Sequence, residues 1–175
     1  MEQFDKYVCV GDTIEWTQDG FTVTAKIEHD PFTGAPWEEH DGHGNVTGWE
    51  HRAKLPGEMV LCEDRGLRRF YDFQGACKIA RRLGVFSPCP IRHAAQAAMR
   101  DFRVLKAWCD DEWFWCGVVV TVSRNGIELA TESLWGIECN YPDSDNSYLG
   151  DVARELATEA METARDAIAA LTEQR

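Results

Sequence analysis

Three residues in the first third of the chain have side chains that bind transition metals. His40, Asp41 and His43 stand together in the run His40-Asp41-Gly42-His43. Imidazole nitrogens and carboxylates are ligands for zinc and manganese, and a metal held here could activate water for hydrolysis. The spacing is only weakly diagnostic, because structural zinc usually recruits thiolates and Cys62 stands well beyond His43. We favour the alternative that these side chains hydrogen-bond the backbone of an ordered loop.

The metal-binding candidates belong to residues 29–52, a segment rich in histidine, glycine and tryptophan. A connection of this length inside a small domain is usually either functional or disordered. Trp37 and Trp49 argue against disorder, since disordered segments are poor in aromatic residues. We therefore predict one long ordered loop, with both tryptophans holding it to the body of the protein.

Arginines in the centre of the chain could bind phosphate groups. Arg81, Arg82, Arg92 and Arg100 fall on two predicted helices, and clustered basic side chains of this kind are typical of a nucleic-acid surface. The formal net charge of −12 opposes the binding of a polyanion by the protein as a whole. We favour the alternative that these arginines pair with the acidic loop or with the C-terminal helix.

A third candidate is the acidic run Asp110-Asp111-Glu112, which follows the second predicted helix. Adjacent carboxylates can bind a cation or raise one another's pKa for general-acid catalysis, although such a run is more often a solvated turn. No GxSxG, HExxH, Walker or GxGxxG motif occurs in the sequence, and no cysteine has a histidine partner close in sequence. We therefore assign no catalytic residue, expect no cofactor, and favour a binding protein over an enzyme.

The elements that must position these residues are predicted from apolar periodicity and turn signals. Alternating runs flank Asp19-Gly20 and Asn125-Gly126, which are turn sequences of β-hairpins. Asp72 is placed to cap a helix, and apolar residues recur at helical spacing in two later segments. The predicted strands are residues 13–17, 21–27, 59–62, 68–71, 113–122 and 127–139. The predicted helices are residues 73–83, 91–109 and 148–171.

The order of these elements lacks the regular alternation of strand and helix that produces a parallel sheet. We therefore predict an α+β fold in which an antiparallel β-sheet of about six strands packs against three α-helices, including a long C-terminal helix. Strand 113–122 should be the centre of the sheet. Both faces of this strand are apolar and both must be covered, which favours either a homodimer or the long loop acting as a lid.

Length and composition limit the classes further. With 175 residues the chain can close one sizeable core, so we expect a single domain over residues 1–175. The seven cysteines are odd in number and scattered singly, mostly in apolar runs, which indicates reduced, buried thiols. No apolar run approaches the length of a membrane span, and the N-terminus lacks the features of a secretion signal. We expect a soluble cytoplasmic protein without membrane contacts.

Charge is distributed along the chain in three blocks. Residues 1–51 carry a net charge of −9, residues 52–108 a net charge of +7, and residues 109–175 a net charge of −10. Such alternation fits two arrangements equally well. In one, the blocks complement each other inside the protein; in the other, an acidic face is presented to a basic partner.

A set of motifs spread over most of the chain, from about residue 8 to 165, is informative as a combination. Its members are Asp41-Gly42-His43-Gly44 with Trp49, Phe70-Tyr71-Asp72-Phe73, Ile79-Ala80-Arg81-Arg82, Asp111-Glu112-Trp113, Cys116-Gly117-Val118-Val119-Val120 and Ser133-Leu134-Trp135-Gly136-Ile137-Glu138. The combination resembles a family of small acidic proteins encoded in tailed-phage and prophage genomes. The family has no established activity, so the resemblance transfers no functional residue. It implies a setting, namely an accessory protein made inside an infected bacterium.

Small acidic phage accessory proteins often bind and block a host enzyme or defence complex, in some cases by imitating the charge of DNA. The resemblance therefore implies a protein that binds a host bacterial protein in the host cytoplasm, for example an anti-defence inhibitor of the anti-CRISPR or anti-restriction type. The positive block weakens the DNA-mimic version. The alternatives are a metal-dependent hydrolase or metal-binding protein, and a nucleic-acid-binding protein. We expect the partner-binding residues to be Asp30, Trp37, Glu38, Glu39, Asp41, Trp49, Asp110, Asp111 and Glu112.

Overall fold

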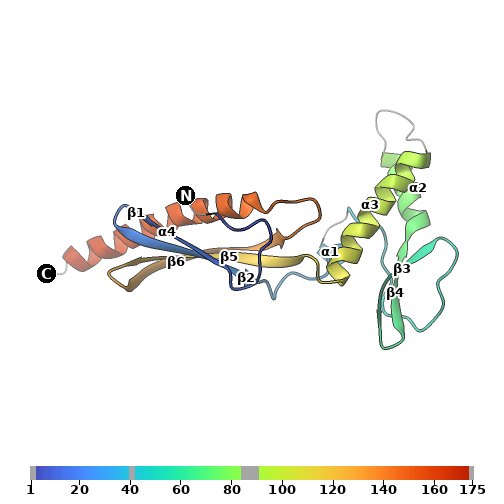
Figure 1. The fold of residues 1–175 in the computed structure, drawn as a ribbon, viewed down its shortest axis with the longest axis horizontal. Helices are drawn as coiled ribbons and strands as arrows, with labels where there is room; N and C mark the ends of the chain where they lie inside the picture. The colour runs from blue at the N-terminus through green and yellow to red at the C-terminus, as the bar shows by residue number, and fades with distance from the viewer. Residues whose placement is uncertain (1–2, 40–41, 84–90, 174–175) are drawn as a thin grey trace. The chain divides into compact units, whose positions relative to one another are not determined.

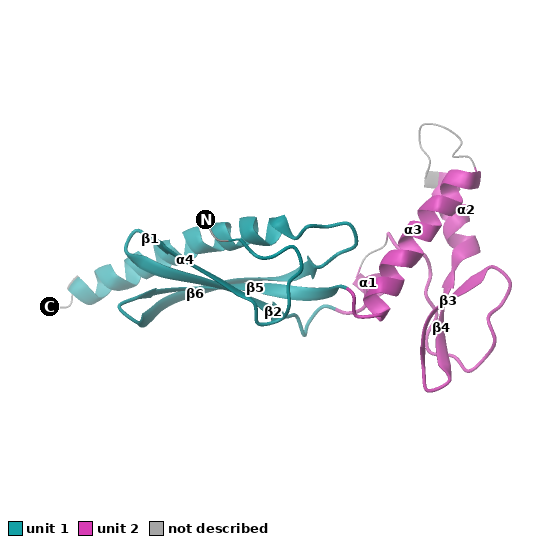
Figure 2. Ribbon diagram, viewed as in Figure 1, with its two compact units in different colours: residues 1–33, 113–175 teal, residues 34–112 magenta. Residues whose placement is uncertain are grey.

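The computed structural model describes residues 3–39, 42–83 and 91–173, and contacts within the chain divide it into two compact units (Figure 1, Figure 2). Unit 1 comprises residues 1–33 and 113–175, and unit 2 comprises residues 34–112. Each unit has its own cluster of buried apolar side chains. The length of the chain suggested one core, whereas the described residues form two, because unit 2 is inserted between two strands of unit 1 and packs on itself.

Unit 1 is a four-stranded antiparallel sheet with one long helix on one face (Figure 1). Its elements are β1 (Thr13–Gln18), β2 (Phe21–His29), β5 (Phe114–Arg124), β6 (Ile127–Cys139) and α4 (Ser147–Glu173). The strand order is β1-β2-β5-β6, so β5 is paired on both sides. The prediction that this strand lies inside the sheet is confirmed.

Two tight turns set the register of this sheet. Asp19 and Gly20, with φ of 52° and 77°, join β1 to β2, and Asn125 and Gly126, with φ of 53° and 76°, join β5 to β6. Positive φ at both central residues is typical of the type I′ turn, whose twist matches that of the flanking strands. Both hairpins were predicted from these dipeptides, and the observed strand pairing confirms them.

The core of unit 1 follows from alternation along its inner strands. Side chains point to opposite faces at successive positions of a strand. Ile27 on β2 and both Val118 and Val120 on β5 are fully buried, and they belong to one cluster with Leu149 of α4. The intervening positions include the half-buried Thr22, Thr24, Thr121 and Ser123 and the exposed Lys26. This sheet therefore packs against α4 on one face and has a polar opposite face, as antiparallel sheets commonly do.

Two apolar positions near the beginning of β5, Trp115 and Gly117, lie on its other face, and the half-buried Val119 follows them on that face. Trp115 packs edge-to-face on Trp113, with 5.2 Å between ring centroids, and Trp113 packs in turn on Tyr141 at 5.2 Å. Gly117 lies under the indole of Trp135, since a Cβ on this glycine would be 2.3 Å from that ring. Unit 1 therefore covers these positions with its own side chains, so they give no reason to require a second subunit or a lid.

Unit 2 is a β-hairpin packed with two helices. Its elements are α1 (Pro36–Glu39), β3 (Glu58–Asp64), β4 (Leu67–Asp72), α2 (Phe73–Leu83) and α3 (Ile91–Cys109). The hairpin forms its own two-stranded sheet, so the expectation of one continuous sheet of about six strands is wrong in this respect.

The hairpin of β3 and β4 forms a separate sheet because its partners all belong to unit 2. The segment that follows the histidine-rich part of the loop pairs with β4 through the bridges Val46↔Tyr71 and Glu50↔Arg68. The apolar face of the hairpin is used within unit 2 as well, because its buried side chains pack against α2 and α3. This second core contains Leu61, Tyr71, Ala76, Ala98 and Leu105.

The predicted helix boundaries are largely confirmed. The Oδ1 atom of Asp72 accepts a hydrogen bond of 2.8 Å from the amide of Gly75 at the beginning of α2, as expected of a capping residue. Gly84, the residue after the predicted helix 73–83 and the one we expect to end it, lies outside the described residues. Within the long loop, α1 is a single helical turn that the sequence did not indicate.

The α+β class is confirmed, with six described strands and a long C-terminal helix. The three predicted helices correspond to α2, α3 and α4. None of the described helices combines the length and the apolar character needed to cross a membrane.

Candidate functional site

Three tryptophans of unit 2 meet at one pocket, which we call the tryptophan pocket. Trp37 comes from α1, Trp49 from the loop segment that pairs with β4, and Trp108 from the last turn of α3. Trp37 and Trp108 pack edge-to-face, with ring centroids 5.3 Å apart. The guanidinium of Arg69 lies over Trp37 at 5.4 Å and over Trp49 at 4.9 Å, so one cation contacts two of the three rings.

The pocket has a volume of about 360 Å³, which is within the range of small-ligand and side-chain sites. Cys62 at β3 and Cys109 at the end of α3 also line it. Burial and a hydrogen bond with Cys62 raise the pKa of the Cys109 thiol to about 12. A thiol in this state is protonated near neutral pH and is a poor nucleophile. The pocket is therefore suited to binding and not to thiolate chemistry.

Carboxylates are part of the lining of the tryptophan pocket. Glu38, Glu63 and Asp64 line it and are exposed, and Arg69 is the one cation among its described lining residues. The Nε atom of Arg68 donates a 2.8 Å hydrogen bond to Glu63 and holds the pKa of that carboxyl below its usual value. Asp64 is paired in turn with Arg65. Glu38 forms no ion pair with a described residue and is therefore the carboxylate of the lining that is open to a basic ligand.

The structure brings together three of the residues that the sequence assigned to partner binding, namely Trp37, Glu38 and Trp49. Glu39 lies next to them on α1, where its Oε1 atom accepts a 2.9 Å hydrogen bond from the amide of Gly34. Asp41 lies outside the described residues. The acidic run 110–112 directly follows α3, and Asp110 pairs with Lys106 of that helix.

Asp30 is not available to a partner, contrary to the sequence prediction. The residue is 2% exposed, and its carboxylate accepts hydrogen bonds of 2.7 Å from the amide of Phe32, 2.7 Å from the hydroxyl of Thr33 and 2.8 Å from the amide of Gly136. Burial acts to raise the pKa of Asp30, but these hydrogen bonds outweigh it and hold the pKa below its usual value. Asp30 therefore fixes the turn after β2 to β6.

Sequence reasoning missed the other residues of the tryptophan pocket. Trp108 falls near the end of the predicted helix 91–109, and helical spacing alone cannot show that this end of the helix borders a pocket. Arg69 was read as part of a short strand, and nothing in its neighbourhood signals the contact with two distant tryptophans. The remaining missed residues are Ala35, Cys62, Glu63, Asp64 and Cys109.

A second pocket of unit 2, of about 170 Å³, surrounds the carboxylate of Asp101 on α3. That carboxylate contacts Nδ1 of His43 at 2.5 Å and accepts hydrogen bonds from the amide of Gly44 at 2.8 Å and the hydroxyl of Tyr71 at 2.6 Å. Burial acts to raise the pKa of Asp101, but these contacts outweigh it and lower the pKa. Burial and the adjacent carboxylate raise the pKa of Tyr71, so its hydroxyl remains a donor. Asp101 thus tethers the loop to α3.

The predicted metal ligands do not form a site within the part of the chain that is described. His43 is held by Asp101, while His40 and Asp41 lie outside the described residues. Among the described histidine, cysteine, aspartate and glutamate side chains, no group of three or more is arranged to hold a metal ion.

The arginines that could bind phosphate, Arg81, Arg82, Arg92 and Arg100, are all exposed on α2 and α3. We expected them to pair with acidic residues of the loop or of the C-terminal helix. No such ion pair is formed with any residue that the structure describes. That expectation is therefore wrong within residues 3–39, 42–83 and 91–173.

Comparison with known proteins returns no relative. No protein-family model, no curated protein and no solved structure matches the chain.

Proposed function

We propose that this protein is a phage or prophage accessory protein that acts by binding a host bacterial protein, with the tryptophan pocket as the principal contact site. The observation that carries the proposal is the convergence of Trp37, Trp49 and Trp108 with Arg69 on one pocket of about 360 Å³. Tryptophan and arginine are the residues most enriched at the energetic centres of protein interfaces. The phage setting rests on the resemblance of the sequence motifs.

The chemistry of the pocket favours a basic segment of the partner. Aromatic rings line it together with three carboxylates, those of Glu38, Glu63 and Asp64. An aliphatic stem ending in a cation can bury its methylene groups against the rings while its charge pairs with the open carboxylate of Glu38. A lysine or arginine side chain of a host protein has this composition.

Unit 1 supplies a second surface for the same kind of partner. It carries 18 acidic and 6 basic side chains, so the whole net charge of −12 belongs to this unit. Such a field accelerates the approach of a basic protein and is weakened by salt. An inhibitor of a DNA-binding host enzyme or defence complex would use these two features together, with the proposed site of action in the host cytoplasm.

The test is capture of a partner from bacterial lysate by the full chain, followed by reconstitution from purified components. We expect a stoichiometric complex whose affinity falls at least tenfold in Trp49→Ala. Trp135→Ala is the matched control, because Trp135 packs on Gly117 in unit 1 and has no part in the pocket. Melting curves of both variants report whether they remain folded.

Two results would contradict the proposal. One is a reconstituted complex that Trp49→Ala leaves unchanged. The other is turnover of a nucleotide or nucleic acid by the isolated protein that requires an added divalent metal, together with stoichiometric metal in elemental analysis that is lost in His43→Ala.

A further inference from the structure

The helices α2 and α3 carry an excess of positive charge on their exposed surfaces. Helix α2 contains Lys78, Arg81 and Arg82 and no acidic residue. Helix α3 contains four basic residues and one acidic residue, Asp101, whose carboxylate is engaged by His43, Gly44 and Tyr71. The six basic side chains considered below are all exposed: Lys78, Arg81, Arg82, Arg92, Arg100 and Arg103.

These six side chains lie in a unit that has as many acidic residues as basic ones, 12 of each. Each exposed cation of unit 2 could therefore find an acidic partner within the unit. Basic residues elsewhere do so: Arg52 pairs with Glu58, Arg165 with Asp19, and Lys106 at the end of α3 pairs with Asp110. None of the six forms an ion pair with a residue that the structure describes.

A contribution to helix stability explains the positions of only some of these six cations. Arg81 and Arg82 lie in the last turn of α2, where a positive charge interacts favourably with the helix dipole. Arg92 lies in the first turn of α3, where the same interaction is unfavourable. Arg100 and Arg103 lie three positions apart in the body of α3, and like charges at this spacing repel each other.

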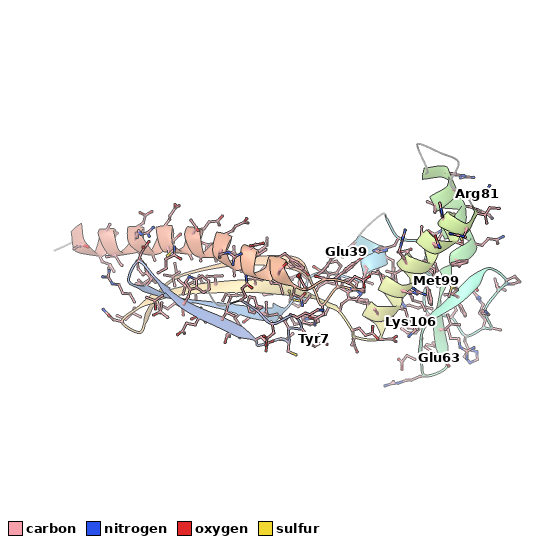
Figure 3. The ribbon with its side chains drawn as sticks, turned by 45° about the horizontal axis from the view of Figure 1, so that its top comes forward. Tyr7, Glu39, Glu63, Arg81, Met99 and Lys106 are labelled. Carbon is pink, nitrogen blue, oxygen red and sulfur yellow. The ribbon has the colours of Figure 1, made fainter. Side chains whose placement is uncertain are left out.

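The shape of the surface indicates the kind of anion. Lys78, Arg81 and Arg82 border a hollow of about 310 Å³ near the end of α2, where Figure 3 places Arg81. From Arg92 to Arg103 the helix α3 rises about 16 Å, which is long enough to follow several phosphates of one strand. The exposed large apolar side chains of these two helices are Ile79 and Ile91, and neither can stack on a base.

We infer that the basic face of α2 and α3 binds the phosphate backbone of a nucleic acid without reading its sequence. Guanidinium groups form paired hydrogen bonds with phosphate oxygens, and five of the six cations are arginines. The net charge of the chain belongs to unit 1, whereas α2 and α3 belong to unit 2, whose own charges balance. This surface is separate from the tryptophan pocket, so the inference does not depend on the proposed function.

The experiment measures binding of the full chain to a 20-base-pair DNA duplex and to a single-stranded RNA of 20 nucleotides by fluorescence anisotropy. With about five phosphates contacted, affinity for the duplex should fall several hundredfold between 50 and 200 mM KCl. Arg81→Glu with Arg82→Glu, and separately Arg100→Glu with Arg103→Glu, should each weaken binding at least tenfold and make the salt dependence shallower. Comparison of the two probes shows which nucleic acid is preferred.

The matched control is Lys6→Glu with Lys54→Glu, which changes the net charge equally at two residues outside α2 and α3. It should weaken binding less than threefold, and Trp49→Ala should have no effect. The inference is overturned if neither probe binds at 50 mM KCl, or if the control weakens binding as much as the helix variants do. It is also overturned if poly-L-glutamate binds this face and the nucleic acids do not, since the partner would then be an acidic polypeptide.

Discussion

The two units of this protein divide charge and shape between them. Unit 1 has a large core and an excess of 12 acidic side chains, whereas unit 2 has 12 acidic and 12 basic side chains and so no net charge. The tryptophan pocket and the Asp101 pocket both belong to unit 2. In unit 2, seven of the twelve cations lie on α2 and α3, which carry one carboxylate between them, whereas the loop and the hairpin carry charges of both signs. Neutral composition therefore conceals a basic surface on the two helices.

The pockets of the two units differ in the side chains that line them. The Asp101 pocket is lined by four alanines of α2 and α3, namely Ala76, Ala80, Ala97 and Ala98. Unit 1 also has a pocket, of about 320 Å³, where the N-terminal segment meets the beginning of α4. Its described lining contains neither a tryptophan nor an arginine, in contrast to the tryptophan pocket of unit 2.

The largest expected effects test whether the two cores are independent. Leu149 in unit 1 and Leu105 in unit 2 are both fully buried, and truncation of either to alanine should cost about 2–5 kcal/mol. Native-state hydrogen exchange read by mass spectrometry should show faster exchange in β2 and β5 for Leu149→Ala. It should show faster exchange in β3, β4 and α2 for Leu105→Ala. Equal loss of protection in both units from either variant would show one cooperative domain, as the length of the chain suggested.

The next predictions compare two carboxylates, one in each unit, that hold a loop in place by hydrogen bonds. Asp101→Asn should cost about 1–3 kcal/mol at pH 7, because the buried donors of Tyr71 and Gly44 lose a charged acceptor. The pKa of Asp101 is lowered on folding, so its contribution is complete above the unfolded value of about 3.9 and is lost as pH falls through the lower folded value. Denaturant unfolding from pH 7 to pH 2 should show the difference between wild type and variant shrinking in acid.

Asp30→Asn is the counterpart in unit 1, since the pKa of Asp30 is also lowered on folding. Its effect should have the same sign and the same loss in acid. A difference between wild type and either variant that grows below pH 4 would contradict the assignment of these carboxylates as ionised anchors.

Much of unit 1 could be predicted because its signals are local. Alternation over β2 and β5 and the turns Asp19-Gly20 and Asn125-Gly126 are properties of a few consecutive residues, and each was read correctly. The sequence did not show that β3 and β4 pair only with each other and form a separate sheet. Alternation identifies a strand, but it does not identify the strand's neighbours in the sheet. The insertion of unit 2 between β2 and β5 has no local signal.

The candidate sites could be predicted only in part, for the same reason. Trp37 and Trp49 were singled out because tryptophan is unusual in a long loop, and both line the pocket. Asp30 looked like an exposed loop carboxylate, but its partner Gly136 is 106 positions away in the sequence. A contact across that distance depends on the pairing of β5 with β6, which is known only after the sheet is assembled.

A smaller loss of stability is expected from a substitution at a hairpin turn of unit 1. A loop glycine of unit 2 serves as the comparison. Gly126→Ala should cost about 1 kcal/mol, because φ of 76° is unfavourable for a residue with a Cβ although no atom obstructs it. Gly48→Ala is the matched control, since a Cβ there also meets open space and φ is not in the left-handed region. Urea unfolding should show the cost at Gly126 alone, and an equal cost at both glycines would mean that backbone strain is not its cause.

The smallest expected change in stability belongs to the residue with the largest proposed role in binding. Trp49 is 43% exposed, and its described contact in unit 2 is with Arg69, an interaction worth about 0.5–1 kcal/mol at an exposed site. Trp49→Ala should therefore lower the free energy of unfolding by no more than about 1 kcal/mol while weakening partner binding at least tenfold. Chemical denaturation and calorimetric titration of the same preparation separate the two effects. Parallel losses of stability and affinity would mean that Trp49 supports the fold of unit 2 and does not contact the partner.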